Sequence, residues 1–360
     1  MTAIKAPATV LVTGASGFIA VWVVKTFLEA GYSARGTVRS ASKGDYLVNL
    51  FKSHGDKFQY VIVEDIAKVR MLDEHREDPL TKHDPQEGAF DEAVKGVDAI
   101  VHTASPFHFQ ADDPQTLIEP AVKGTLGILA SAHKHAPTVQ RIVITSSVAA
   151  IVDPSKPSGT VFTENDWNSF SLREVETKGN AAAGGEKYRA SKTLAEKAAW
   201  TYLEERQPKY DIATINPPMV FGPILHQVSN PESLNTSVAL LYKILQTKES
   251  DLTREVLLTN NLNFVDVRDV ALAHLRALEI PEAGGQRFIT AGGTFCWQDT
   301  LDALQPPNPR GIAGIGKGLV HSRYDASKAT KVLGIKFKNL EESVRDTEEG
   351  LRQRGWGVKA

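Results

Sequence analysis

Short runs of apolar, largely β-branched residues recur along the first two thirds of the chain, and segments with helical character fit between most of them. Runs of this length that end in glycine or polar residues are typical of strands buried on both faces. The predicted strands are Thr9–Thr13, Ser33–Val38, Tyr60–Val63, Asp98–His102, Arg141–Thr145 and Asp211–Ile215. Because strands that alternate with helices pair in parallel, the pattern predicts an α/β fold with a doubly wound parallel sheet.

The last third of the chain is less regular. It contains the apolar run Asn263–Val267, the helical segments Asp269–Glu279 and Asn339–Arg352, and a stretch rich in proline and glycine from Gln305 to Gly318. We therefore expect a sheet domain over residues 1–222 and a smaller lobe over 223–360, with some segments returning to the sheet. Within the first domain, Lys68–Gln86 is strongly charged and contains two prolines, which predicts an exposed insertion.

Composition excludes several classes of partner. The formal net charge of −2 gives no electrostatic reason to expect a nucleic acid or an anionic membrane. The one cysteine, Cys296, cannot form an intramolecular disulfide, which is typical of a reducing compartment. Met1 to Thr9 lacks the pattern of a signal peptide, and the apolar stretches are too short to span a bilayer. We expect a cytoplasmic protein, present as a monomer or a homodimer.

The first predicted strand runs into the glycine-rich turn GASGFIA at the start of a predicted helix. In the spacing G-x-x-G-x-x-A, Gly14 permits a tight turn, Gly17 lets the backbone approach a pyrophosphate, and Ala20 lets helix and strand pack closely. The free N–H groups of the helix N-terminus then meet the phosphates. The turn, in its strand–turn–helix context, predicts a dinucleotide site of the Rossmann type.

The residues after the second strand indicate which dinucleotide binds. Sheets that bind NAD usually carry Asp or Glu at the end of this strand, where the carboxylate holds the ribose 2′-OH. This chain has Arg39 at that place and Lys43 just beyond it. A guanidinium fork suits a 2′-phosphate and stacks on adenine, so the pattern favours NADPH.

Tyr188 and Lys192 form the motif Y-x-x-x-K within a good helix sequence. Residues four apart share one face of a helix, so the ammonium of Lys192 is expected near the Tyr188 hydroxyl. This cation, together with an oxidised nicotinamide, is expected to lower the pKa of Tyr188. Tyr188 can then donate a proton to a carbonyl oxygen while hydride reaches the carbonyl carbon.

A third candidate group follows the predicted strand Arg141–Thr145. The carboxyl ends of parallel strands face the ligand crevice, and two serines, Ser146 and Ser147, stand at this end. Either hydroxyl can hydrogen-bond a substrate carbonyl and orient it, and the pattern alone does not choose between them.

Together these motifs resemble the extended short-chain dehydrogenase/reductases. More narrowly, the chain is similar to the dihydroflavonol 4-reductase-like branch, near the microbial NADPH-dependent aldehyde, methylglyoxal and ketone reductases. The resemblance covers most of the chain and rests, in order, on VTGASGFIA, GTVRSASK, VHTASPF, TSSVAA, YRASKTLAEKAAW, NPPMVFGP, NTS and NFVDVRDVALAH. The chain departs from the pattern at Lys68–Gln86, where relatives have only a few residues.

The resemblance implies site residues along all of these motifs. The family's catalytic serine, tyrosine and lysine map to Ser147, Tyr188 and Lys192, and the lysine also binds the nicotinamide ribose. The other implied cofactor contacts are Gly14, Ala15, Ser16, Gly17, Phe18, Ile19, Arg39, Lys43, Asp65, Ile66, Thr103, Ala104, Pro217, Val220 and Ser237. Phe107 and Phe109 follow the fourth strand, where relatives line the substrate pocket.

The predicted activity is the NADPH-dependent reduction of aldehydes and ketones to alcohols. The candidate pocket walls are largely apolar, and apolar walls discriminate weakly, which favours a broad range of small to medium carbonyl substrates. These wall residues are Phe107, Phe109, Pro218, Met219 and Phe221. Two alternatives stay open: a nucleotide-sugar epimerase or dehydratase, and a non-catalytic regulator that senses NADP.

Other polar residues are expected to have structural roles. The histidines show no clustering with cysteines or carboxylates, so we predict no metal site. His102 ends a buried strand and is expected to be a packed, hydrogen-bonded histidine. Cys296 stands between two aromatic residues and is expected to be a packing thiol.

Overall fold

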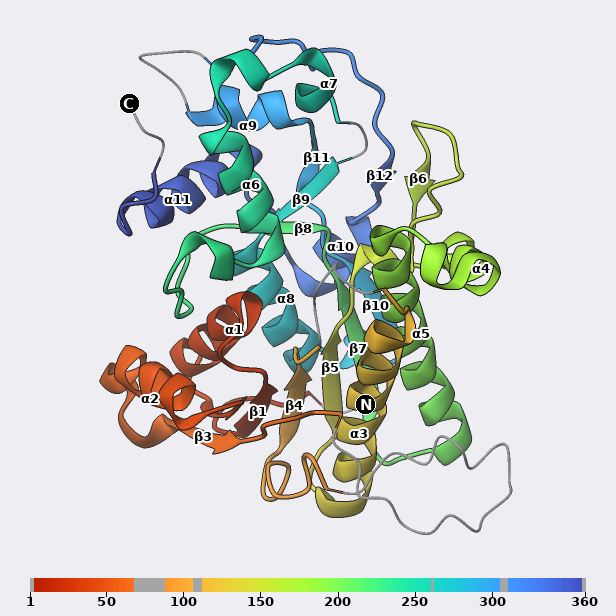
Figure 1. Ribbon diagram of the computed structural model, residues 1–360. Coiled ribbons are helices and arrows are strands. Elements are labelled where there is room, and N and C mark those ends of the chain that lie inside the picture. The colour runs from red at the N-terminus through yellow and green to blue at the C-terminus, as the bar shows by residue number, and fades with distance from the viewer. Residues whose placement is uncertain (1–2, 68–87, 106–111, 260–261, 305–309, 358–360) are drawn as a thin grey trace.

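The computed structural model of the protein describes residues 3–67, 88–105, 112–259, 262–304 and 310–357 (Figure 1). Within these residues a seven-stranded sheet has the order β10-β7-β5-β4-β1-β2-β3, and all of its strand pairs are parallel. The strands are β1 (Thr9–Thr13), β2 (Ser33–Val38), β3 (Phe58–Ile62), β4 (Ala99–His102), β5 (Arg141–Thr145), β7 (Asp211–Asn216) and β10 (Gln286–Ile289). The predicted fold class and its six strands are confirmed, whereas β10 was not predicted from the sequence.

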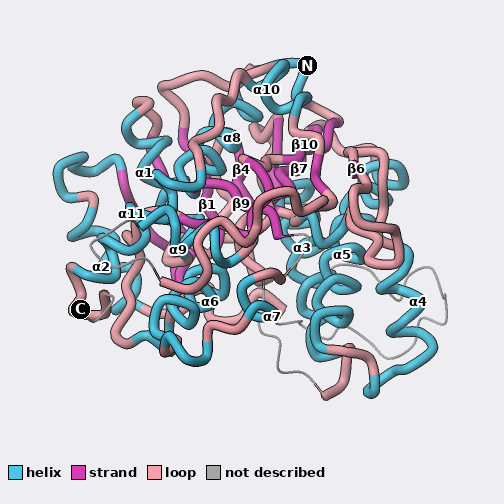
Figure 2. The backbone as a smooth tube through the Cα atoms, turned by 90° about the horizontal axis from the view of Figure 1, so that it is seen from above, coloured by secondary structure: helices cyan, strands magenta, loops and turns pink. Residues whose placement is uncertain are grey.

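Helices cover both faces of this sheet (Figure 2). Since successive strand residues point to opposite faces, Val10 and Val12 pack with one set of helices and Leu11 with the other. The first set is α1 (Phe18–Glu29), α2 (Ala41–Leu50) and α8 (Val267–Glu279), and the second is α3 (Gln115–His135) and α5 (Gly184–Arg206). The resulting three layers are the doubly wound arrangement that the sequence predicted.

Much of the rest of the chain packs beyond the carboxyl ends of these strands (Figure 1). Two small sheets lie there, and their strands are β8 (Met219–Phe221), β9 (Leu262–Asp266), β11 (Gly293–Phe295), β6 (Val161–Phe162) and β12 (Arg323–Tyr324). The remaining α-helices are α4 (Ser169–Lys178), α6 (Thr236–Gln246), α7 (Arg254–Leu257), α9 (Trp297–Leu304), α10 (Ser327–Leu333) and α11 (Leu340–Arg352). The predicted helices that begin near residues 269 and 339 are confirmed as α8 and α11.

The chain after residue 222 contributes to both parts of the molecule. α8 packs on α1, and β10 joins the central sheet beside β7. A boundary at residue 222 therefore stays a prediction. The predicted insertion Lys68–Gln86 lies outside the described residues. No helix in the described part of the chain is long and apolar enough to cross a membrane.

A buried ion pair fixes the amino ends of the central strands. Arg141, the first residue of β5, is fully buried and binds both carboxylate oxygens of Asp211, the first residue of β7, at 2.6 and 2.9 Å. Its remaining donors reach the backbone carbonyls of Ala277, Ile280 and Pro281 at the end of α8. The guanidinium therefore holds a helix end against two strands.

Candidate active site

The glycine-rich turn lies where the strand order reverses, between β1 and β4, the place at which open α/β sheets bind ligands. Gly14 has a φ of +64°, and an added Cβ would lie 3.0 Å from the Cα of Ala104. A side chain there would be strained and would also clash, so glycine is required. The Gly17 N–H bonds the Gly14 carbonyl at 2.9 Å, and α1 begins at Phe18.

The turn is held between the ends of β2 and β4. Gly14 N–H donates to the Thr37 hydroxyl at 3.0 Å, while the Thr13 hydroxyl accepts from the N–H groups of Thr103 and Ala104 at 3.1 Å. The same Thr13 hydroxyl forms a hydrogen bond with His102 at 2.9 Å. His102 is thus the packed, hydrogen-bonded histidine that the sequence predicted, and burial lowers its pKa to about 3. Thr103 and Ala104 lie against the turn, and their contact with a dinucleotide stays a prediction.

Arg39 and Lys43 flank the start of α2. Arg39 is exposed directly after β2, and Lys43 is half-buried in the first turn of α2. Neither cation has an ion-pair carboxylate within the described ranges. Both charges are consequently available to a phosphate at the edge of the turn.

Asp65 and Ile66 lie in the loop after β3. Asp65 is exposed, and its carboxylate accepts the Ala67 N–H at 2.8 Å. Ile66 packs over Gly124 of α3, where a Cβ would lie 3.0 Å from the Ile66 Cδ1. The loop is therefore fixed against α3, and its contact with the cofactor stays a prediction.

The candidate catalytic residues come from two elements. Tyr188 and Lys192 lie on one face of α5, and the Lys192 Nζ is 6.0 Å from the centre of the Tyr188 ring. Ser147 follows β5 and forms a hydrogen bond with Tyr188. Its hydroxyl also accepts the Ala149 N–H at 3.1 Å, which caps a short 3-10 turn. The structure thus brings the three predicted residues together.

The two serines after β5 point in different directions. The Ser146 hydroxyl donates to the buried Glu196 carboxylate, on the side of the sheet. The Ser147 side chain faces Tyr188 and lies 3.4 Å from the Pro217 carbonyl. Of the two, Ser147 is the one placed to meet a substrate beside Tyr188.

Burial shifts the pKa values of the pair in opposite directions. It raises the pKa of Tyr188 to about 12, although the Ser147 hydrogen bond and the Arg189 charge lower it. Loss of hydration thus outweighs both of these contributions, and the lowering of the Tyr188 pKa expected with an oxidised nicotinamide bound stays a prediction. Burial lowers the pKa of Lys192 to about 8, and Glu196 raises it. Tyr188 consequently keeps its hydroxyl proton at physiological pH.

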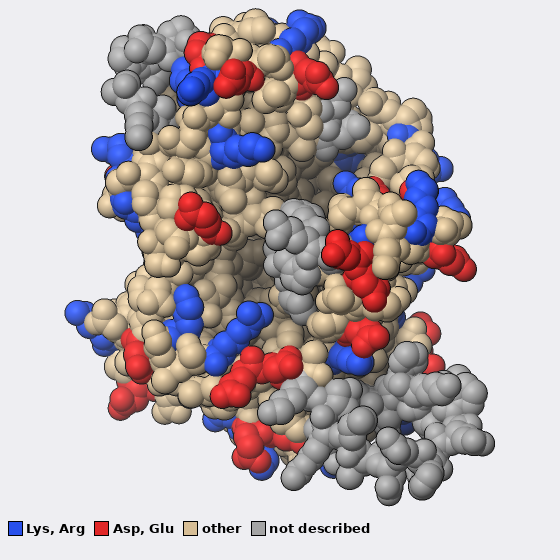
Figure 3. Space-filling model, viewed as in Figure 1, with Lys and Arg blue, Asp and Glu red and all other residues tan. Residues whose placement is uncertain are grey.

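Two adjoining cavities meet at these residues. One, of about 250 Å³, is bordered by the glycine-rich turn, Thr103, Lys192, Pro217, Val220 and Ser237. The other, of about 530 Å³, opens toward the C-terminal segments, next to the hollow visible in Figure 3. Ser147 and Tyr188 line both cavities. A group bound in one cavity is thereby brought against a group bound in the other.

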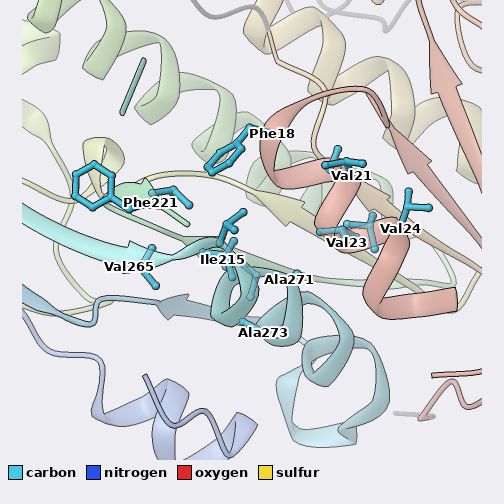
Figure 4. Close-up of a cluster of buried hydrophobic side chains, with 14 of the residues drawn as sticks. Phe18, Val21, Val23, Val24, Ile215, Phe221, Val265, Ala271 and Ala273 are labelled. Atoms are coloured by element: carbon cyan, nitrogen blue, oxygen red, sulfur yellow. The ribbon is translucent and has the colours of Figure 1, made fainter. Parts of the chain in front are cut away.

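The walls of the larger cavity differ in part from the predicted ones. Pro218 and Met219 line it as predicted. Phe221 does not: it is fully buried and packs edge to face on Phe295 at 5.6 Å, within the cluster of Figure 4. Its ring packs into the core, although Met219 two residues earlier in β8 lines the cavity. Phe107 and Phe109 lie outside the described residues. Further walls come from Val152, Phe162, Arg189, Leu240, Leu262, Asn263 and Tyr324.

Three buried polar residues behind the catalytic pair were not predicted. They are Glu196 on α5, Asn216 at the end of β7, and Arg287 on β10. Glu196 shares the helix face of Tyr188 and Lys192, and the spacing in YRASKTLAE carries that signal. The strand signal of β10 is only the run RFIT between glycine pairs, which is too short to separate from a turn.

Comparison with known proteins gives the family. The sequence profile described as "NAD dependent epimerase/dehydratase family" matches residues 10–292, and the chain belongs to this family. It is 39% identical to the ketoreductase azaE of Aspergillus niger, over 96% of this chain and 98% of the relative. It is 35% identical to the NADPH-dependent methylglyoxal reductase GRE2 of Saccharomyces cerevisiae, over 94% and 96% of the two chains.

Solved structures agree with this assignment. Gre2 of Candida albicans in complex with NADPH superimposes with a TM-score of 0.83 and 34% identity, covering 96% of this chain and 99% of that one. The UDP-glucuronic acid 4-epimerase of Bacillus cereus, at 16% identity and a TM-score of 0.66, shares the fold. The resemblance to extended short-chain dehydrogenase/reductases, drawn above from sequence motifs, is confirmed.

Proposed function

We propose that the protein is an NADPH-dependent reductase that converts aldehydes and ketones to alcohols, and that it acts in the cytoplasm. One observation carries the proposal: Ser147 and Tyr188 stand on the wall shared by a dinucleotide-type cavity and a larger second cavity. The similarity to a ketoreductase and to methylglyoxal reductases supports the same activity.

The residues present fit a phosphorylated nicotinamide dinucleotide. The turn at Gly14 provides N–H groups at the start of α1, and the first turn of α1 carries no acidic residue that would repel phosphate. Arg39 and Lys43 offer charges without carboxylate partners among the residues described, as a 2′-phosphate requires. Lys192, Pro217, Val220 and Ser237 would border the nicotinamide end.

The bound cofactor would supply hydride to the carbonyl carbon. Tyr188 donates its hydroxyl proton to the carbonyl oxygen, which becomes the alcohol, and the pKa of about 12 keeps that proton in place until the oxygen becomes basic. Ser147 orients the carbonyl through a hydrogen bond. Lys192 stabilises the phenolate that the proton transfer leaves behind.

We also propose that the segments after residue 222 supply part of the substrate contacts. Leu240, Leu262 and Tyr324 belong to this part and line the larger cavity together with Met219 and Phe162. These largely apolar walls suit small to medium carbonyl compounds that carry an ester, a second carbonyl or an aromatic group.

The proposal is tested with NADPH and a panel of carbonyl compounds. The panel contains aromatic aldehydes, β-keto esters, 1,2-dicarbonyls, a dihydroflavonol and a sugar nucleotide. We expect oxidation of NADPH with several neutral carbonyl compounds. Activity confined to the sugar nucleotide would favour an epimerase or dehydratase instead. NADPH binding without turnover of any member would favour a sensing protein.

A further inference from the structure

Glu196 lies one helical turn after Lys192 on α5 and is almost completely buried. A carboxylate and an ammonium four residues apart on a helix normally pair. Here they do not. Across the described ranges, no carboxylate comes within ion-pair distance of Lys192, whereas the Glu196 Oε1 is 2.6 Å from the Nε of Arg287.

The other partners of Glu196 also draw its carboxylate toward the sheet. Oε1 accepts from the Thr214 hydroxyl at 3.2 Å, and Oε2 accepts from the Asn216 amide at 2.8 Å and from the Ser146 hydroxyl. The same Asn216 amide donates to the backbone carbonyl of Ser147 at 3.2 Å. One carboxylate thereby connects α5 to the strand end that carries Ser147.

Arg287 is itself held firmly. It stands on β10 opposite Thr214 of β7. Its guanidinium donates to the backbone carbonyls of Glu164 and Asp166 at 2.6 and 2.8 Å and lies 3.8 Å from the ring centre of Trp167. The direction from which Arg287 binds Glu196 is therefore set by the sheet and by the loop after β6.

The cluster keeps one positive charge in excess. Lys192 and Arg287 are cations, Glu196 is a single anion, and both His102 and Tyr188 are neutral at physiological pH. A buried charge without a partner is costly. The ammonium of Lys192 borders the smaller of the two cavities described above, where a phenolate or an electron-rich ligand group can use it.

We propose that Arg287 is a positioning residue of the active site: by binding Glu196 it keeps that carboxylate off Lys192, so the ammonium charge remains available to Tyr188 and to the cofactor cavity. This inference rests on the proposed reductase function. Arg287 touches neither cavity, so it acts only through Glu196 and Lys192.

The charged and titratable groups around Lys192 come from three elements. Tyr188 and Glu196 lie on its own helix, His102 lies on β4, and Arg287 stands behind Glu196 on β10. The pKa of Lys192, about 8, decides whether the ammonium is present. Turnover that needs the ammonium is high below this pKa and falls as pH rises through it.

Two charge-removing variants are expected to move this fall in opposite directions. Glu196→Gln removes the anion that raises the pKa of Lys192, so the fall moves to lower pH by about one unit. Arg287→Gln removes a cation and frees Glu196 to pair with Lys192, so the fall moves to higher pH by about one unit. Because the freed Glu196 neutralises the ammonium, Arg287→Gln also lowers kcat at neutral pH about tenfold.

The pKa of Lys192 is also measured without turnover. Competitive labelling with acetic anhydride at several pH values, read on the Lys192 peptide by mass spectrometry, reports the neutral amine. Absence of turnover in the wild type would count against the proposed function. Unchanged labelling curves in both folded variants would count against the role of Arg287.

Arg141→Gln is the matched control, because Arg141 forms the other buried arginine–carboxylate pair of the sheet, at its amino edge. It is expected to lower stability and leave the labelling curve of Lys192 in place. Arg287→Lys keeps the cation and should therefore keep the wild-type labelling curve of Lys192. This variant is used if Arg287→Gln does not fold. Shifts of Glu196→Gln and Arg287→Gln in the same direction would overturn the proposal, as would a shift in Arg141→Gln.

Discussion

The central sheet holds two buried arginines whose hydrogen bonding differs. Arg141 lies at the amino ends of the strands, and Arg287 lies near the candidate active site. At the amino edge, Arg141 binds both oxygens of Asp211, and its other donors are used by three backbone carbonyls. Near the site, Arg287 binds one oxygen of Glu196, and its buried Nη2 has no hydrogen-bond partner in the described part of the chain. The first arrangement satisfies every group, as a purely structural pair should.

Around Arg287, some buried polar groups do not make all the hydrogen bonds or ion pairs that they could make. Lys192 lacks a carboxylate partner in the part of the chain that is described, and Tyr188 keeps its proton. Stability alone would favour pairing these groups internally. The comparison teaches that a buried ion pair can serve either packing or chemistry, and that the neighbours left unpaired distinguish the two cases.

The largest effect is expected from Tyr188→Phe, which removes only the proposed proton donor. Turnover should fall on the order of a hundredfold to ten-thousandfold, while NADPH binding and the melting temperature stay near the wild-type values. Steady-state kinetics and thermal unfolding measure both. The control is Tyr210→Phe. It also removes one tyrosine hydroxyl, which in the wild type donates to the Leu129 carbonyl far from the cavities. Near-normal kcat in Tyr188→Phe would make the assigned donor wrong.

Arg141→Met should have the largest effect on stability. It leaves Asp211 and three carbonyls without a buried partner, which costs about 3–5 kcal/mol of unfolding free energy. Urea unfolding measures the loss, and kcat of the folded fraction should stay within about twofold. A large drop in kcat with unchanged stability would contradict the purely structural role of Arg141.

Arg39→Ala sharpens the comparison from the cofactor side. Loss of a charge-assisted phosphate contact should raise the dissociation constant of NADPH tenfold to a hundredfold, or about 1.5–3 kcal/mol, and leave that of NADH unchanged. Fluorescence titration with both dinucleotides measures this difference. Arg276→Ala, an exposed arginine near the amino edge, should change neither constant. Equal losses for NADPH and NADH would mean that Arg39 does not bind the 2′-phosphate.

The smallest effect is expected at two buried histidines. His274 is satisfied, since its Nδ1 donates to the Val270 carbonyl at 2.8 Å and its Nε2 bonds the Thr145 hydroxyl at 2.7 Å. His226 packs on Phe18, and neither of its ring nitrogens has a hydrogen-bond partner among the described residues. His226→Phe should therefore raise the unfolding free energy by about 1 kcal/mol, and His274→Phe should lower it.

The pH dependence of stability gives the sign of the His226 effect independently. Burial lowers the pKa of His226 to about 4, below its unfolded value of 6.5. The unfolded chain then binds the extra proton between these values, so stability falls as pH drops from 6.5 toward about 4, by about 1.4 kcal/mol per pH unit. His226→Phe should make this fall shallower in thermal unfolding. An unchanged slope would show that another group is responsible.

The parts of the fold that the sequence predicted depend on local patterns. The turn at Gly14 and the strand before it combine one hydrophobic run with a required positive φ, and both signals are contained within a few residues. Tyr188 and Lys192 are likewise joined by helical spacing alone. Such features follow from short-range geometry, so the printed sequence suffices to find them.

The parts that were missed depend on distant contacts. Arg287 reaches Glu196 across 91 residues, and nothing in its own four-residue strand indicates that partner. Phe221 was placed in the pocket as an apolar residue of the motif NPPMVFGP, but its direction is set by packing on the distant Phe295. The raised pKa of Tyr188 also depends on the surrounding packing, which the sequence does not reveal.

The position of β10 in the chain has a consequence for synthesis. The other six strands of the central sheet end by Asn216, whereas β10 begins at Gln286. While the ribosome is still translating the segment between them, Glu196 has no Arg287 to bind, and Lys192 stands one helical turn before it on α5. The nascent chain can therefore assemble a dinucleotide crevice early. The ion pair between Glu196 and Arg287 forms only after β10, the last strand of the central sheet, has been synthesised.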